Sequence, residues 1–210
     1  MKRILLGLTV FAAVNAAPAG LAAQEGTPLT VGRTVADSLA AGETDTFILD
    51  VAAERFVLGE VDQESVDVVV TIFGPGGERI SSTDVSPRGP DIFQFDTEKA
   101  GRYRIEVAPF EEQTGRYTVV IRRNEAIATD PEARVDQLMA AYDGPVPGGY
   151  IGVVEGGELA FAKAYGMADL TYGIPFGLDT KNNIGSTSKQ FTAFAVLLLE
   201  DRGELSLDDD

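Results

Sequence analysis

Two residues three positions apart, Ser186 and Lys189, have the types and the spacing that chemistry could use. They lie between a polar loop at 179–183 and an apolar run, Phe191 to Leu199, that has the length of a helix. Gly203 follows this run, as a glycine often follows the last turn of a helix. The spacing therefore predicts that a hydroxyl and an amine share one face at the N-terminus of a helix.

A serine hydroxyl becomes a good nucleophile when a neighbouring base takes its proton, and a neutral lysine is able to be that base. Burial and the positive end of a helix dipole both disfavour the charged form of Lys189. The same dipole favours an alkoxide on Ser186, so the pair is suited to acyl transfer. The alternative interpretation, a serine that caps the helix and a lysine on its surface, stays open.

The residue types that are missing narrow the chemistry further. The chain contains no cysteine and no histidine. Disulfides, thiolate nucleophiles, Cys/His zinc sites and a Ser-His-Asp triad are therefore excluded within this sequence. Asp62, Glu64, Asp67 and Asp84 do not have the spacing of a calcium loop and are interpreted as a solvated acidic face. We expect neither a metal nor a cofactor, and lysine is the natural candidate for the base.

Several motifs around Ser186 resemble the opening of the serine β-lactamase-related family, which includes class C β-lactamases, D-alanyl-D-alanine carboxypeptidases and related esterases. The motifs are Ala164–Leu170, Pro175-Phe176, Asp179-Thr180, Ile184–Ala193 and Leu205–Asp209. The resemblance implies that Ser186 is the acylated nucleophile and that Lys189 is its partner. The family also uses a later Tyr-x-Asn or Tyr-x-Ser motif and a Lys- or His-x-Gly motif, which do not occur after Ser186 in these 210 residues. We therefore expect 131–210 to be the N-terminal part of a hydrolase domain, and the chain by itself to be an inactive fragment.

Composition and the N-terminal residues indicate an exported, acidic protein. The formal net charge is −16, which repels nucleic acid and anionic membranes, so neither is an expected partner. Residues 1–23 resemble a signal peptide, with Lys2 and Arg3 before a short apolar stretch and with small residues at the end. Because that stretch is shorter than the about 20 residues that a span needs, we expect no membrane span after cleavage and a secreted or periplasmic protein.

Residues 24–123 show the alternation of a β-sandwich. Apolar residues recur at every second position in five runs: Phe47–Val51, Val66–Ile72, Phe93–Phe95, Tyr103–Val107 and Tyr117–Ile121. Glycine- and proline-containing turns separate these runs, which indicates antiparallel strands. The segment is similar to the bacterial pre-peptidase C-terminal-like domain through Ala41–Phe47, Phe73–Gly77 and Ala100–Tyr103. That resemblance implies an accessory module that binds a cell-wall or extracellular ligand.

The rest of the chain predicts a second domain of mixed α and β structure. Residues 124–130 are expected to form a linker, and Asp130 and Pro131 to start a helix with an apolar stripe of Val135, Leu138, Met139 and Tyr142. A hairpin is predicted from 150–154 and 159–165, followed by a buried helix led by Ser186 on which the sheet packs. The family resemblance implies that the rest of this sheet comes from later residues, so in this chain the hairpin is expected to have an unpaired edge and the helix an uncovered face. The predicted fold is thus an all-β sandwich followed by the truncated start of an α/β (α+β) domain of the β-lactamase/transpeptidase type.

Two functions from different classes remain open on these residues. The first is an exported serine hydrolase that acts on a β-lactam, D-alanyl peptide or ester carbonyl through an acyl-enzyme at Ser186, with Lys189 as base. The second is a non-catalytic secreted protein that binds or builds extracellular structures with its β-sandwich.

Overall fold

The computed structural model describes residues 25–209, and the chain divides into two compact units after Gln137. The predicted signal peptide, 1–23, lies outside the described residues. Each unit is described by itself below. Among the residues that are described, no helix is long and apolar enough to cross a membrane.

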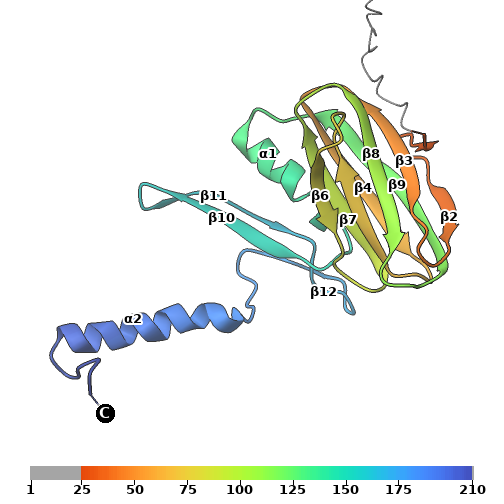
Figure 1. Cartoon of the computed structure of the whole chain (residues 1–210). Helices are drawn as coiled ribbons and strands as arrows, with labels where there is room; N and C mark the ends of the chain where they lie inside the picture. The colour runs from red at the N-terminus through yellow and green to blue at the C-terminus, as the bar shows by residue number, and fades with distance from the viewer. Residues whose placement is uncertain (1–24, 210) are drawn as a thin grey trace, which may run out of the picture. The chain divides into compact units, whose positions relative to one another are not determined.

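The first unit is a sandwich of two β-sheets (Figure 1). One sheet has the strand order β1-β3-β8-β5-β6, with β1 parallel to β3 and the other neighbours antiparallel. Its strands are β1 (Thr27–Pro28), β3 (Asp45–Val51), β5 (Val68–Phe73), β6 (Arg79–Thr83) and β8 (Gly101–Pro109). The antiparallel second sheet, in the order β2-β9-β4-β7, contains β2 (Val35–Leu39), β4 (Arg55–Gln63), β7 (Gly89–Thr97) and β9 (Gly115–Ala126).

The core between the sheets consists of the alternating residues that the sequence pattern picks out. Phe47, Val70, Ile105, Tyr117 and Ile121 are each at most 1% exposed and belong to one buried cluster. Successive side chains of a strand point to opposite faces, so one residue in two enters this cluster. The predicted all-β sandwich is confirmed.

Strand β4 does not alternate and was not predicted. Phe56, Val57 and Leu58 are consecutive and all buried, which means that β4 is covered on both faces. Val57 belongs to the core cluster. Phe56 points to the opposite face, where the guanidinium of Arg134 lies 5.6 Å from the centre of its ring. A helix therefore covers the outer face of this sheet at Phe56.

That helix is α1 (Pro131–Leu138), which begins where the sequence predicts. The Asp130 carboxylate accepts a hydrogen bond of 2.9 Å from the backbone N–H of Ala133, so Asp130 is the N-cap and Pro131 the first helical residue. The preceding strand, β9, continues to Ala126, whereas the sequence suggested that the sandwich ends at residue 123. The stretch without regular structure before α1 is correspondingly shorter than the predicted linker, 124–130.

The second unit contains short strands and helices. They are the 3₁₀ turn η1 (Ala140–Tyr142), β10 (Gly149–Glu155), β11 (Glu158–Tyr165), β12 (Met167–Asp169), β13 (Ile174–Pro175), the 3₁₀ turn η2 (Gly185–Thr187) and α2 (Ser188–Asp201). The predicted hairpin is confirmed: β10 and β11 pair around Gly156 and Gly157, whose φ angles are 60° and 87°. Positive φ at both central residues is what a tight hairpin turn of this kind requires.

Two glycines bring distant parts of the second unit into close contact. A Cβ atom at Gly148 would lie 2.2 Å from the carbonyl oxygen of Tyr165 and 2.7 Å from the nitrogen of Met167. Gly166, with a φ of 65°, faces Gly148 across this crossing. The two backbones therefore cross without side chains between them. The second unit as a whole combines helices with β-strands, as the predicted fold class requires.

Candidate active site

The candidate site is the turn that leads into α2. The side-chain oxygen of Asn183 accepts a hydrogen bond of 2.7 Å from the backbone N–H of Gly185. Gly185 has a φ of 52°, which favours glycine because a Cβ atom is strained in this conformation. The Ser188 hydroxyl donates to the carbonyl oxygen of Gly185 over 2.8 Å. These bonds fix the 3₁₀ turn that carries Ser186.

Ser186 and Lys189 are brought together as their spacing predicts. The Nζ atom of Lys189 donates a hydrogen bond of 3.2 Å to the Oγ atom of Ser186. Ser186 lies in the 3₁₀ turn and Lys189 is the second residue of α2, so one turn of helical backbone separates them. A hydroxyl and an amine at this distance are able to exchange a proton.

The electrostatic setting of the pair is that of a helix N-terminus. Helix α2 has 14 residues, and its first turn contains no acidic side chain that would offset the positive end of the dipole. The 3₁₀ turn already accepts from the N–H of Ser188, the first residue of α2, through the carbonyl oxygens of Gly185 and Ser186, so what α2 offers an anion here is mainly its dipole. An alkoxide on Ser186, or an oxyanion beside it, would be stabilised here.

The other end of α2 closes as the sequence predicts. Gly203 has a φ of 70°, and its N–H bonds to the carbonyl oxygen of Glu200 over 2.8 Å. The N–H of Glu204 bonds to the carbonyl oxygen of Leu199 over 3.0 Å. These two bonds define a Schellman motif, which confirms Gly203 as the residue that ends the helix.

The described residues leave this helix uncovered, as the sequence predicts for a chain that lacks the rest of the sheet, and they do not provide the burial predicted for the complete domain. Phe191 is 63% exposed, Phe194 is 61% exposed, and no residue of α2 is buried. Ser186 and Lys189 are exposed as well. The physical reason is that no other part of residues 138–209 covers the apolar side of α2. The desolvation that favours a neutral lysine is therefore not provided by the part of the chain that is described.

The described residues offer no metal site to supplement the pair. Within 25–209, no group of three or more acidic side chains is arranged to hold an ion. The acidic residues considered in the sequence are spread over the sandwich. Burial raises the pKa of Asp67, and the neighbouring Asp84 raises it further. Asp67 and Asp84 therefore repel each other, and the solvated acidic face stays a prediction.

Sequence reasoning did not find the residues that shape the turn around the pair. Asn183 was noted only as part of a polar loop, although an asparagine two residues before a glycine is a signal for a side-chain turn onto the backbone. Ser188, which lies between Ser186 and Lys189, is given no role by the spacing of that pair. Its bond to Gly185 joins the helix to the turn that presents Ser186.

The C-terminal part of the chain, which contains Ser186 and Lys189, is similar in sequence to known proteins. Residues 132–210 match the family model described as Beta-lactamase. A D-aminopeptidase from Brucella anthropi is 44% identical over 79 residues, which cover 38% of this chain and 14% of that protein. Protein flp from Staphylococcus aureus (strain N315) is 31% identical over 86 residues, covering 40% of this chain and 17% of the relative. The predicted resemblance to the β-lactamase-related family is confirmed, and the chain spans about a sixth of the length of these curated relatives.

Solved structures with similarity to the chain include two β-rich domains. One is the pre-peptidase C-terminal domain of a collagenase from Bacillus anthracis, with a TM-score of 0.38 and 16% identity, covering 47% of this chain and 95% of that one. The other is PliG from Aeromonas hydrophila, a periplasmic inhibitor of g-type lysozyme, with a TM-score of 0.38 and 16% identity, covering 46% of this chain and 96% of that one.

Proposed function

We propose that residues 132–210, which match the Beta-lactamase family, contribute the nucleophile and the base of a serine hydrolase, with Ser186 as nucleophile and Lys189 as base. The observation that supports this most is the 3.2 Å contact between Lys189 Nζ and Ser186 Oγ at the start of α2. The substrate class is a carbonyl compound with an amine or alcohol leaving group: an amide, a D-alanyl peptide, an ester or a β-lactam.

The reaction proceeds in two acyl-transfer steps. Lys189, in its neutral form, takes the proton of the Ser186 hydroxyl while Oγ bonds to the substrate's carbonyl carbon. The backbone N–H of Ser186 stabilises the resulting oxyanion, and the bond to the leaving group breaks as Lys189 returns the proton to it. Water then attacks the acyl-enzyme, which releases the acid and restores Ser186.

The base step needs more than the contact that is seen here. In the described geometry the amine donates to Ser186 Oγ, whereas the base step needs the amine's lone pair to face the hydroxyl proton at the same distance. A neutral amine is favoured when water is removed from around it. The proposal therefore includes a covering group, from the substrate or from a further part of the protein, that desolvates Lys189 during the reaction.

The proposed place of action is outside the cytoplasm. Its support is the N-terminal sequence, in which Lys2 and Arg3 precede an apolar stretch and small residues, as in a signal peptide. An exported protein would meet cell-wall peptides and β-lactams. N-terminal sequencing of the protein recovered from culture medium and periplasm tests this, because cleavage near residue 23 is expected.

A kinetic experiment tests the proposed chemistry. The protein expressed from its gene is assayed on a D-alanyl amide, a p-nitrophenyl ester and a chromogenic β-lactam. We expect Ser186→Ala and Lys189→Ala to lower kcat/KM at least 10³-fold on the substrate that is turned over, and Ser206→Ala, at an exposed serine after the end of α2, to retain most of the activity. Equal activity of Ser186→Ala and Ser206→Ala would exclude Ser186 as nucleophile.

A second candidate function is a non-catalytic binding protein, and one observation favours it. The sandwich has a complete core of its own, whereas the apolar side of α2 is exposed. In this case the purified protein would bind isolated cell wall with the same affinity in wild type and Ser186→Ala, and it would turn over none of the three substrates.

A further inference from the structure

Helix α1 is held on the sandwich by polar contacts, while its apolar stripe is only partly covered, with Val135 and Met139 half-buried and the other two members exposed. Gln137 is 7% exposed and is the one buried residue of α1. Leu138 and Tyr142, which the sequence pattern places on the buried side, are 43% and 48% exposed. The amphipathic pattern therefore explains only part of why this helix lies on the sandwich.

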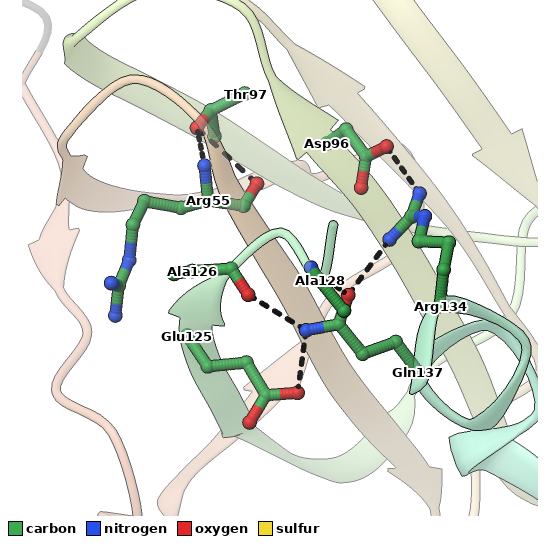
Figure 2. A network of polar contacts seen from close by, with 8 residues as sticks. All are labelled: Arg55, Asp96, Thr97, Glu125, Ala126, Ala128, Arg134 and Gln137. Atoms are coloured by element: carbon green, nitrogen blue, oxygen red, sulfur yellow. Dashed lines mark hydrogen bonds and ion pairs between the residues drawn. The ribbon is translucent and has the colours of Figure 1, made fainter. Parts of the chain in front are cut away.

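The side chain of Gln137 has all its hydrogen-bonding capacity satisfied by four partners (Figure 2). Its oxygen accepts from the N–H of Ala128 over 2.9 Å and from Arg134 over 3.1 Å. Its nitrogen donates to the carboxylate of Glu125 over 3.1 Å and to the carbonyl oxygen of Ala126 over 2.8 Å. An amide has two acceptor sites and two donors, so this set is complete. Gln137 thus joins the end of β9, the segment after it and the helix.

Arg134 makes a second connection, to strands that are distant in sequence. Its guanidinium forms an ion pair with Asp96 of β7, as Figure 2 shows, and it lies over the ring of Phe56 of β4. The same guanidinium donates to Gln137. Three strands of one sheet, β4, β7 and β9, are therefore connected to α1 through two side chains.

An eight-residue helix is too short to be stable alone, because isolated helices below about 12–15 residues are marginal in water. The contacts of Arg134 and Gln137 must therefore supply most of what keeps α1 folded. Without them, residues 127–137 would become an extended tether, which spans at most about 3.3–3.6 Å per residue.

We propose that Arg134 and Gln137 form a clamp that makes α1 part of the sandwich and fixes the junction between the two units at Gln137–Leu138. The family-matched segment, which begins at residue 132, then starts inside the sandwich unit. The clamp keeps 127–137 short and ordered, where a linker between domains would be flexible. This inference does not depend on the chemistry of Ser186.

Amide hydrogen exchange of the whole chain, followed by mass spectrometry, tests the clamp. In wild type, peptides that cover 131–137 should exchange at least tenfold more slowly than an unstructured peptide. Asp96→Ala, which changes only the partner on β7, and Gln137→Ala should each remove at least tenfold of that protection. Glu132→Ala, an exposed change on the same helix, is the matched control and should leave it in place.

The result is judged by comparing the loss of amide protection in α1 with the loss in the strands. Protection that falls in α1 and stays in β4, β7 and β9 supports the clamp. If Gln137→Ala lowers protection in the strands as well, the test rests on the Asp96→Ala variant, because Asp96 is exposed and its loss leaves the core unchanged. Unprotected α1 amides in wild type, or equal protection in Asp96→Ala and Glu132→Ala, would overturn the proposal.

Discussion

Gly59 of β4 lies directly under the ring of Phe93 of β7. A Cβ atom at Gly59 would stand 2.1 Å from the nearest ring atom, and Phe93 is 1% exposed. The two residues are paired across the antiparallel strands, so the ring occupies the space that a side chain at position 59 would need. The core at this point therefore requires a glycine at position 59 to make room for the ring of Phe93.

Replacing Gly59 by alanine should therefore destabilise the sandwich. We expect Gly59→Ala to lower the free energy of unfolding by about 1–3 kcal/mol, as overpacking of a core does. Urea unfolding followed by circular dichroism measures this. In a Phe93→Leu background the added methyl group has more room, so the same change should cost less; equal costs in both backgrounds would contradict the steric explanation.

The buried phenol of Tyr117 and the carboxylate of Asp45 form a pair whose strength depends on pH. Tyr117 donates to Asp45 over 2.6 Å. Burial raises the pKa of Asp45 above its ordinary value of 3.8, and the bond from Tyr117 opposes this rise. Because the folded protein holds this proton more tightly than the unfolded one, the contribution of Asp45 to stability falls as pH rises through the raised pKa.

Tyr117→Phe removes the bond and should raise the pKa of Asp45 further. We expect a loss of about 1.5–3 kcal/mol in unfolding free energy at pH 7, the range for hydrogen bonds to charged groups. The loss should shrink as pH falls through the raised pKa of Asp45 in the two folded proteins, and it should be smallest at pH 3.8 and below, where Asp45 is already protonated in both folded proteins. Urea unfolding at pH 3, 5 and 7 measures the trend, and a loss that does not change with pH would contradict this role of Asp45.

The crossing at Gly148 gives a prediction for the second unit with a neighbouring control. Gly148→Ala would place a methyl group 2.2 Å from the Tyr165 carbonyl oxygen, whereas Gly149→Ala meets nothing within 4 Å. We expect Gly148→Ala to destabilise the unit by about 1–3 kcal/mol and to speed amide exchange in β11 and β12. Gly149→Ala should leave exchange there close to wild type, and identical exchange in the two variants would refute the close crossing.

Backbone strain before Ser186 is predicted to matter more than equal strain at the far end of α2. Gly185 and Gly203 have φ angles of 52° and 70°, so alanine costs about 1–2 kcal/mol at either position. Only Gly185 is next to Ser186. We expect Gly185→Ala to slow acylation at least tenfold and Gly203→Ala to change it less than threefold, measured as the rate of covalent labelling by a serine-reactive probe. Equal rates would show that the turn does not position Ser186.

The sequence predicted the sandwich well where one face of each strand is covered. Runs such as Phe47–Val51 and Tyr103–Val107 alternate, and the structure places their alternate residues in one core. Strand β4 was missed because Phe56, Val57 and Leu58 are all apolar. A run of consecutive apolar residues indicates a strand that is covered on both faces. The outer face of β4 is covered at Phe56 by Arg134 of α1.

Helix α1 shows where pattern reading fails. The spacing of Val135, Leu138, Met139 and Tyr142 indicated the buried face, but Gln137 is the residue that is buried. A glutamine is buried when its four hydrogen-bonding sites are satisfied, and three of its partners come from 125–128, outside the helix. Periodicity within the helix carries no information on such partners.

The candidate site was predicted as far as local spacing reaches. A spacing of three positions on a helical turn is enough to predict the contact between Ser186 and Lys189. In the structure, Lys189 Nζ and Ser186 Oγ are 3.2 Å apart. Burial of the helix depends on residues far along a chain, and the apolar run Phe191 to Leu199 does not reveal what covers it. The sequence predicts an uncovered face for this helix in the present chain, and the structure adds that Phe191 and Phe194 are among the exposed residues.

The most direct test of the proposed chemistry is to locate a covalent adduct. The protein is incubated with a β-lactam and with a fluorophosphonate, and peptides are mapped by mass spectrometry. We expect one adduct of either probe on Ser186, its absence in Ser186→Ala, and its persistence in Ser206→Ala, a change at an exposed serine outside the turn. An adduct that persists in Ser186→Ala, or one that maps to another serine in wild type, would contradict the assignment of Ser186 as the acylated nucleophile.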